Sequence, residues 1–184
     1  MLDTGKEFTP RDMYYYANEL ADHGEYLEAI KKYEEFLETK QGWIEDNIRA
    51  CFRIGDCYLE LNEKDKAINA ALRTFSYDLP RPEACCRIGF YYMEQNKNNE
   101  AIYWYKHALL HSDSVESSLS LQTPAFSTWL PHLQLCVLYD RLKDYKTAFM
   151  HNEMAGKYIP NSEKVLYNKK TEGTDNLLFA VYAK

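Results

Sequence analysis

The chain has 184 residues, 46% of them hydrophobic, and it carries a net charge of −6. This acidic balance argues against binding to a nucleic-acid backbone, which needs a basic face, and no apolar run reaches the ~20 residues of a membrane-spanning helix. Five cysteines lie inside helical patterns, and the N-terminus lacks an apolar signal region, so we predict reduced thiols in a cytoplasmic protein.

A first helix pair is predicted directly after a polar N-terminal segment, residues 1–9, which we interpret as a linker. Thr9 and Pro10 are typical of a helix start, because threonine caps the first turn and proline is tolerated at the first helical position. Gly24 is free to adopt the left-handed conformation that ends many helices. The two helices on either side of it form a first repeat over about residues 10–40.

The strongest pattern in the chain recurs after 34 residues. Residues 51–62 and 85–96 are identical at seven of twelve positions, and each copy carries apolar residues at i, i+3, i+4 and i+7, which is one stripe of a helix. A period of 34 is typical of a helix–turn–helix repeat array. Gly55 and Gly89 lie in the middle of these helices, where glycine costs up to ~1 kcal/mol relative to alanine. We therefore predict that another helix packs closely against each glycine.

Three further segments lie between or after the repeats. Residues 111–125 are rich in serine and have no steady period, so we predict a surface insertion that is less ordered than the repeats. Residues 161–170 predict a short helix that caps the last repeat. Residues 171–184 are apolar near their end, and they form either a tail packed into a groove or the remnant of a further segment. The predicted repeats cover about residues 10–40, 43–80, 82–111 and 127–160.

Several residues could bind a metal or take part in catalysis, but for each of them we favour a structural role. Cys51 and Cys85 are small core residues, since cysteine is among the most buried residue types. His107 and His111 have the i,i+4 spacing that can hold zinc, but no surrounding motif supports a site, and we favour a solvated helix end. No catalytic motif is present, and we expect no cofactor and no metal. The three tryptophans are interpreted as core or inter-repeat residues rather than a sugar-stacking set: Trp43, Trp104 and Trp129.

The repeated phrase resembles the tetratricopeptide repeat (TPR) family. The resemblance rests on Ile54, Gly55 and Tyr58, on their counterparts Ile88, Gly89 and Tyr92, and on the small residues Ala67 and Ala101. It implies an all-α fold: a right-handed superhelix of four helix pairs with a C-terminal capping helix. It also implies a module that binds a protein or a peptide.

Four longer phrases resemble the repeat segment that follows the GT-A domain of some bacterial family-2 glycosyltransferases. They are residues 11–20, 43–51, 77–81 and 129–136, and the resemblance spans about residues 8–165. It implies a non-catalytic arm whose partner is the glycosyltransferase domain or its acceptor. The Asp-x-Asp motif that holds the donor's metal in such enzymes is absent from the chain. The alternative hypothesis is a free-standing adaptor or regulator that binds peptides.

A binding site on the concave face is implied by the TPR resemblance, because the first helix of each pair lines that face in the family. The guanidinium groups of Arg53 and Arg87, beside aromatic rings, are suited to bind a carboxylate or a phosphate on an extended ligand. The alternative is that Asp56, Glu60 and Glu94 neutralise the arginines as ordinary salt bridges. The six candidate residues are Tyr14, Asn18, Phe52, Arg53, Arg87 and Phe90.

Overall fold

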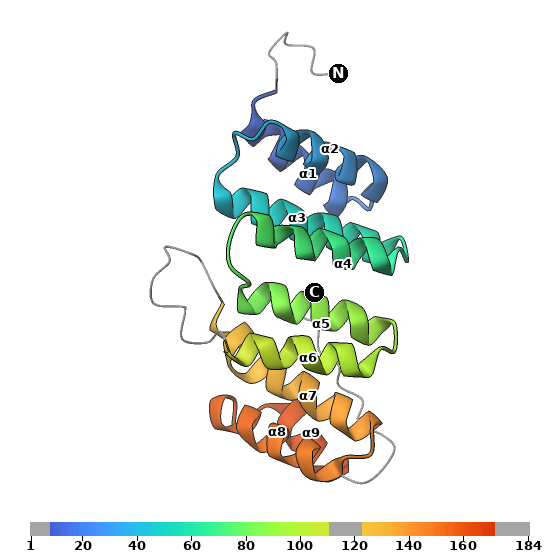
Figure 1. Cartoon of the computed structure of the whole chain (residues 1–184), viewed down its shortest axis with the longest axis vertical. Coiled ribbons are helices and arrows are strands. Elements are labelled where there is room, and N and C mark those ends of the chain that lie inside the picture. The colour runs from blue at the N-terminus through green and yellow to red at the C-terminus, as the bar shows by residue number, and fades with distance from the viewer. Residues whose placement is uncertain (1–7, 111–122, 172–184) are drawn as a thin grey trace. The chain divides into compact units, whose positions relative to one another are not determined.

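The computed structural model describes residues 8–110 and 123–171 (Figure 1). Within these ranges the chain forms nine α-helices and no β-strand, which confirms the all-α class. The sequence predicts one continuous array, whereas the helices gather into two compact units that divide between Leu79 and Pro80. The predicted insertion, apart from residues 123–125, and nearly all of the linker and the tail lie outside the described residues.

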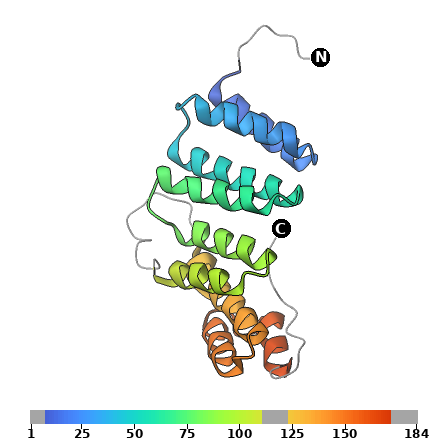
Figure 2. The same ribbon diagram turned by 45° about the vertical axis from the view of Figure 1, so that its right-hand side comes forward.

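The first unit consists of two helix pairs joined by short turns (Figure 2). Its elements are α1 (Pro10–Asp22), α2 (Tyr26–Glu38), α3 (Ile44–Glu60), α4 (Lys64–Arg73) and the short 3-10 helix η1 (Thr74–Ser76). The start of α1 is fixed by a reciprocal cap, in which the Asp12 N–H donates to the Thr9 hydroxyl at 3.2 Å and the Thr9 N–H donates to the Asp12 carboxylate at 3.0 Å. This arrangement satisfies backbone donors that a helix start would otherwise leave unpaired.

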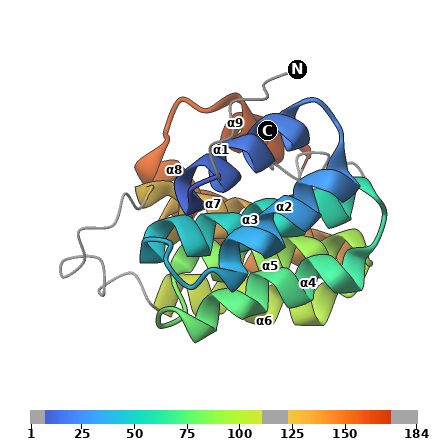
Figure 3. The same ribbon diagram turned by 90° about the horizontal axis from the view of Figure 1, so that it is seen from above.

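The core of the first unit is built from small and aromatic residues on facing helices. Ala17 of α1 and Ala29 of α2 are fully buried, and their small side chains let the two helices approach closely. Tyr33 and Phe36 fill the space between α1, α2 and α3. The third helix, α3, packs against both helices of the first pair (Figure 3). Trp43 differs from its prediction as a packing residue: it precedes α3 and is 58% exposed, because α3 begins one residue later and turns that side chain outward.

The second unit contains the remaining helices. They are α5 (Pro82–Glu94), α6 (Asn98–Leu110), the 3-10 helix η3 (Pro124–Ser127), α7 (Trp129–Arg141), α8 (Tyr145–Tyr158) and α9 (Glu163–Thr171). Pro131 lies in the first turn of α7, where its missing N–H would have no partner in any case, and so the helix runs through it. Trp104 and Trp129 are partly buried against the core of this unit, in agreement with their prediction.

The repeated glycine of the second unit is a packing position, as the sequence predicts. Gly89 of α5 is buried against Tyr105 of α6, and a Cβ built on it would lie 3.0 Å from a ring carbon. That distance is too short for an ordinary carbon–carbon contact. The α5–α6 pair therefore depends on the absence of a side chain at this position.

All five cysteines are free thiols with buried side chains. Burial raises the pKa of Cys51 to about 11 and that of Cys85 to about 12, because a charged thiolate is disfavoured away from water. The interpretation of these residues as core positions is confirmed.

Candidate functional site

The candidate residues of the first unit converge on one buried hydroxyl, that of Tyr33. Tyr33 donates to the Asn18 side-chain oxygen at 2.6 Å, and the Nε of Arg53 donates to the Tyr33 oxygen at 3.2 Å. The same guanidinium also contacts the Asn18 backbone carbonyl at 3.4 Å and forms an ion pair with Asp22. Arg53 on α3 is thereby connected to both α1 and α2.

These hydrogen bonds, together with burial, determine the charge states of Arg53 and Tyr33. Burial alone lowers the pKa of Arg53, but the hydrogen bonds that its guanidinium donates to Tyr33 and Asp22 outweigh burial and raise the pKa, so the guanidinium stays charged. Burial raises the pKa of Tyr33, so its hydroxyl keeps the proton that it donates to Asn18. Arg53 therefore acts in the first place as a brace between three helices. An anionic ligand would have to displace Asp22 to reach it.

Tyr14 and Phe52, the other two candidates in this unit, have different environments. Tyr14 is half-buried and packs its ring on Phe36, with centroids 5.4 Å apart, and edge-on against Tyr33 at 6.2 Å. Phe52 is buried, with 4% of its surface exposed. Of the four candidates in this unit, Asn18 and Arg53 form a direct contact, and Tyr14 joins them through a side-chain hydrogen bond with Asn18 and its ring contact with Tyr33.

Arg87 and Phe90 belong to the second unit, on α5. The Nε of Arg87 donates to the Glu83 carboxylate at 3.2 Å, one turn earlier on the same helix. The Arg87 side chain is 17% exposed, and Phe90 is half-buried with its ring 6.0 Å from that of Tyr91. Arg53 pairs with Asp22, and Arg87 pairs with Glu83.

A pocket of about 230 Å³ lies in the first unit between α2 and α4, with α3 as its floor. The floor is apolar, since Cys51, Ile54 and Ala70 are buried there. Such a volume is smaller than most small-molecule sites and is suited to one side chain of a bound chain. The lining residues are Glu34, Cys51, Ile54, Tyr58, Lys66, Asn69, Ala70 and Arg73.

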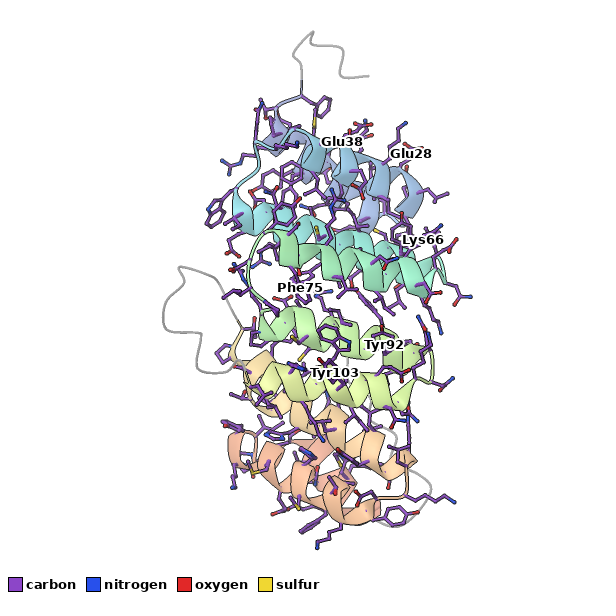
Figure 4. The ribbon with its side chains drawn as sticks, viewed as in Figure 1. Glu28, Glu38, Lys66, Phe75, Tyr92 and Tyr103 are labelled. Carbon is purple, nitrogen blue, oxygen red and sulfur yellow. The ribbon has the colours of Figure 1, made fainter. Side chains whose placement is uncertain are left out.

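Charged groups of both signs surround the mouth of this pocket. Arg73 of α4 reaches Glu34 of α2 with an N–O distance of 2.5 Å. The Lys66 ammonium, near the start of α4 (Figure 4), lies 5.5 Å from the centroid of the Tyr58 ring and 3.3 Å from the Glu63 carboxylate. An apolar floor with a charged rim can hold a peptide's apolar side chain while exchanging ion pairs with its neighbours. Sequence reasoning missed this pocket.

A histidine pair lies between α7 and α8 in the second unit. The Nδ1 atoms of His132 and His151 are 2.9 Å apart, and Tyr139 stacks on His151 with ring centroids 5.6 Å apart. Burial and the nearby His132 lower the pKa of His151 to about 4, and burial also lowers the pKa of His132. Both rings are neutral near pH 7. Within residues 8–110 and 123–171, no cluster of three or more His, Cys, Asp or Glu side chains is placed to hold a metal ion.

Two segments of the chain, residues 48–77 and 82–110, match the family model described as tetratricopeptide repeat. The chain therefore contains tetratricopeptide repeats, which is what the recurrence of the 51–62 phrase at 85–96 predicts. No curated protein matches the sequence significantly. Within the described part of the chain, no helix has the length and apolar character needed to cross a membrane.

Solved structures of TPR proteins resemble the chain over most of its length. The crystal structure of MamA has a TM-score of 0.65 at 14% identity and covers 90% of this chain and 84% of its own. A tetratricopeptide repeat protein from Parabacteroides merdae ATCC 43184 gives 0.65 at 15% identity, covering 91% of this chain and 59% of its own. YrrB, described as a TPR protein with an unusual peptide-binding site, gives 0.60 at 12% identity, covering 91% and 80%. At these identities the likeness shows the fold alone.

Proposed function

We propose that the chain is a non-catalytic interaction scaffold that binds a protein or a peptide. The observation that carries this proposal is the pocket between α2 and α4, with its buried apolar floor and its charged rim. Repeat proteins of this architecture bury their helices against neighbours and use the remaining surfaces for binding. The peptide-binding site named for YrrB supports the same class of function by analogy.

In this proposal the pocket takes one apolar side chain of the bound segment. The Glu34–Arg73 ion pair at its mouth is more than a third exposed on both sides, so it can open at small cost and re-form with charges on the ligand. Most of the affinity then comes from covering the apolar floor, at about 25 cal/mol for each Å² removed from water. The rim supplies orientation rather than affinity.

Peptides selected from a random display library against the whole chain test this proposal. Asn69 is exposed and lines the pocket, so Asn69→Trp should block it and weaken binding at least about tenfold, equivalent to 1.4 kcal/mol. Lys31→Trp, on an exposed position of α2 outside the pocket, is the matched control and should bind normally. Equal affinity of both variants would remove the pocket from the proposal.

Arg87, a candidate for the concave face that the TPR resemblance implies, is the second contact in the proposal. Its ion pair with Glu83 can exchange for one with a ligand carboxylate or phosphate. Arg87→Glu should abolish binding of an anionic peptide while leaving the helical content unchanged. Full binding by Arg87→Glu and by the Arg53/Arg87 double variant would exclude this face as the contact.

We further propose that the scaffold is the C-terminal arm of a bacterial family-2 glycosyltransferase and positions its acceptor or a partner protein. The support is the resemblance of the four phrases quoted from the sequence. The alternative is a free-standing adaptor or regulator. The reading frame of the gene separates the two: an upstream GT-A domain in frame supports the arm, and translation starting at Met1 supports the adaptor. Turnover of sugar nucleotides by the isolated chain would contradict a non-catalytic role.

A further inference from the structure

The last helix, α9, is fastened to α7 and α8 by buried contacts. Asn152 of α8 donates to the Val165 carbonyl at 3.0 Å, and Asn168 donates to the Asn152 side-chain oxygen at 3.2 Å. Asn152 and Asn168 are fully buried, and Val165 is 1% exposed. Because these hydrogen bonds join buried side chains of α9 to α8, α9 is a fixed part of the second unit and not a frayed end.

The same contacts fix the direction in which α9 runs. Near its start, the Val165 side chain packs against Ala155 and lies next to Gly156 on α8. Nearer its end, Lys169 pairs with Glu153 at 2.7 Å. The positions on α8 thus decrease as the chain advances along α9, so the two helices are antiparallel, and the chain leaves α9 toward the N-terminal half of α8.

The N-terminal half of α8 presents apolar side chains to solvent where α9 stops. A helix rises 1.5 Å per residue, so the nine residues of α9 span roughly 14 Å and the fourteen of α8 roughly 21 Å. Phe149 lies one turn before Glu153, and Tyr145 one turn before Phe149. These two residues are 44% and 37% exposed, and Leu142 in the preceding turn is 44% exposed.

The sequence that follows Thr171 has the length and composition to cover these side chains. After five polar or small residues it reads Leu-Leu-Phe-Ala-Val-Tyr over residues 177–182. A chain spans at most about 3.3–3.6 Å per residue, so the segment from 172 to 177 can extend about 20 Å. Two helical turns, which separate Glu153 from Tyr145, need only about 11 Å. The apolar run can therefore reach all three exposed residues.

We propose that residues 177–182 dock on the apolar surface of Leu142, Tyr145 and Phe149, and so continue the cap that α9 begins. We assign the docked segment to this chain's own tail because the chain leaves α9 in the direction of that surface. An intramolecular segment also has a far higher effective concentration than a separate partner. The burial of apolar area on both sides supplies the driving force.

Disulfide trapping in the full-length chain tests the proposal, since the five native thiols are buried. Phe149→Cys combined with a cysteine scanned through residues 177–182 should form an intramolecular disulfide under mild oxidation. Met150→Cys is the matched control: it is adjacent in sequence and 56% exposed, but it points about 100° away around the helix. It should cross-link at least about tenfold more slowly.

Each other outcome overturns the proposal. Equal cross-linking rates for Phe149→Cys and Met150→Cys would mean that residues 177–182 have no preferred position on α8. Cross-linked dimers would assign the surface to a second copy, and no cross-link would leave it to another partner. A second measurement uses the single substitutions: Phe179→Asp should increase maleimide labelling of Phe149→Cys about tenfold and leave labelling of Met150→Cys unchanged. Unchanged labelling at both positions would also count against docking.

Discussion

Arg53 and Arg87 occupy equivalent repeat positions, 34 residues apart, and each forms an ion pair inside its own unit. In the first unit Arg53 joins α3 to the Tyr33 hydroxyl on α2 and to Asp22 at the end of α1. In the second unit the 3.2 Å bond of Arg87 goes to Glu83 on its own helix. Inside its own unit, the partner of each repeated arginine thus depends on what the neighbouring helices of that unit offer.

The comparison also separates two ways of stabilising a helix pair. The first unit adds a polar brace across three helices, whereas the second places glycine against a tyrosine ring and a neutral histidine pair in its interior. The two units should therefore respond differently to acid and to substitution.

Acid should destabilise the second unit more than the first. A histidine whose folded pKa lies below its unfolded value of about 6.5 contributes full stability above that pH and loses it as the pH falls toward the folded value. For His151, with a pKa of about 4, the loss is about 1.4 kcal/mol per pH unit and up to about 3 kcal/mol in all. Lys106 and Lys157 add repulsion once the rings are charged.

Amide hydrogen exchange between pH 7 and 4.5 measures this effect separately in each unit. The control is His151→Phe, which keeps a ring against Tyr139 but cannot take up a proton. It should remove most of the pH slope from α7 and α8. A slope of the same size in this variant would show that other groups cause the acid response.

Gly89→Leu should lower the free energy of unfolding of the second unit by about 2 kcal/mol, because the new side chain overpacks the Tyr105 ring. Chemical denaturation followed by circular dichroism measures the change. Combining it with Tyr105→Ala should cost less than the sum of the single changes, since the clash is then relieved. Additive effects would contradict the contact, as would an unchanged melting temperature of Gly89→Leu.

Arg53→Met should destabilise the first unit by about 1–2 kcal/mol. Methionine keeps much of the aliphatic stem but removes the bonds to Tyr33 and Asp22, leaving a buried hydroxyl without its donor. Hydrogen exchange should show the loss in α1, α2 and α3 together. Loss confined to α3 would mean that Arg53 does not brace the other two helices.

The Arg87–Glu83 pair should show the smallest effect: its coupling energy in a double-mutant cycle of Arg87→Met and Glu83→Gln should be about 0.5 kcal/mol or less, because an ion pair within one helix contributes little. The same denaturation experiment measures it. A coupling energy as large as the cost of Arg53→Met would contradict this expectation.

The sequence predicts the helices well because their signals are local. Thr9 and Pro10 set the start of α1, Pro82 sets the start of α5, and the repeated stripe of residues 51–62 defines the buried face of α3. The role of Gly89 also follows, since a helical glycine without a packing reason would be costly. The helix starts and the buried stripe depend on residues within a turn or two of one another, whereas the partner of Gly89, Tyr105, lies on the next helix.

The site is less predictable because its partners come from distant parts of the chain. Asp22 is 31 residues from Arg53, and nothing in the sequence distinguishes it from other acidic residues at helix ends. Tyr33 lies on the apolar face of α2, so its sequence position indicates core packing and not a hydrogen bond. The α2–α4 pocket arises from how three helices leave space between them, which no residue pattern encodes.

Because all five cysteines are buried, the rates at which their thiols are labelled can be used to measure local opening of the structure. Cys51 and Cys57 lie in the first unit, and Cys85, Cys86 and Cys136 lie in the second. Since each thiol must become exposed before a reagent can modify it, the rate of labelling in native buffer reports how often its surroundings open. Mass spectrometry of the labelled peptides would then give separate opening rates for the two units from the unmodified natural sequence.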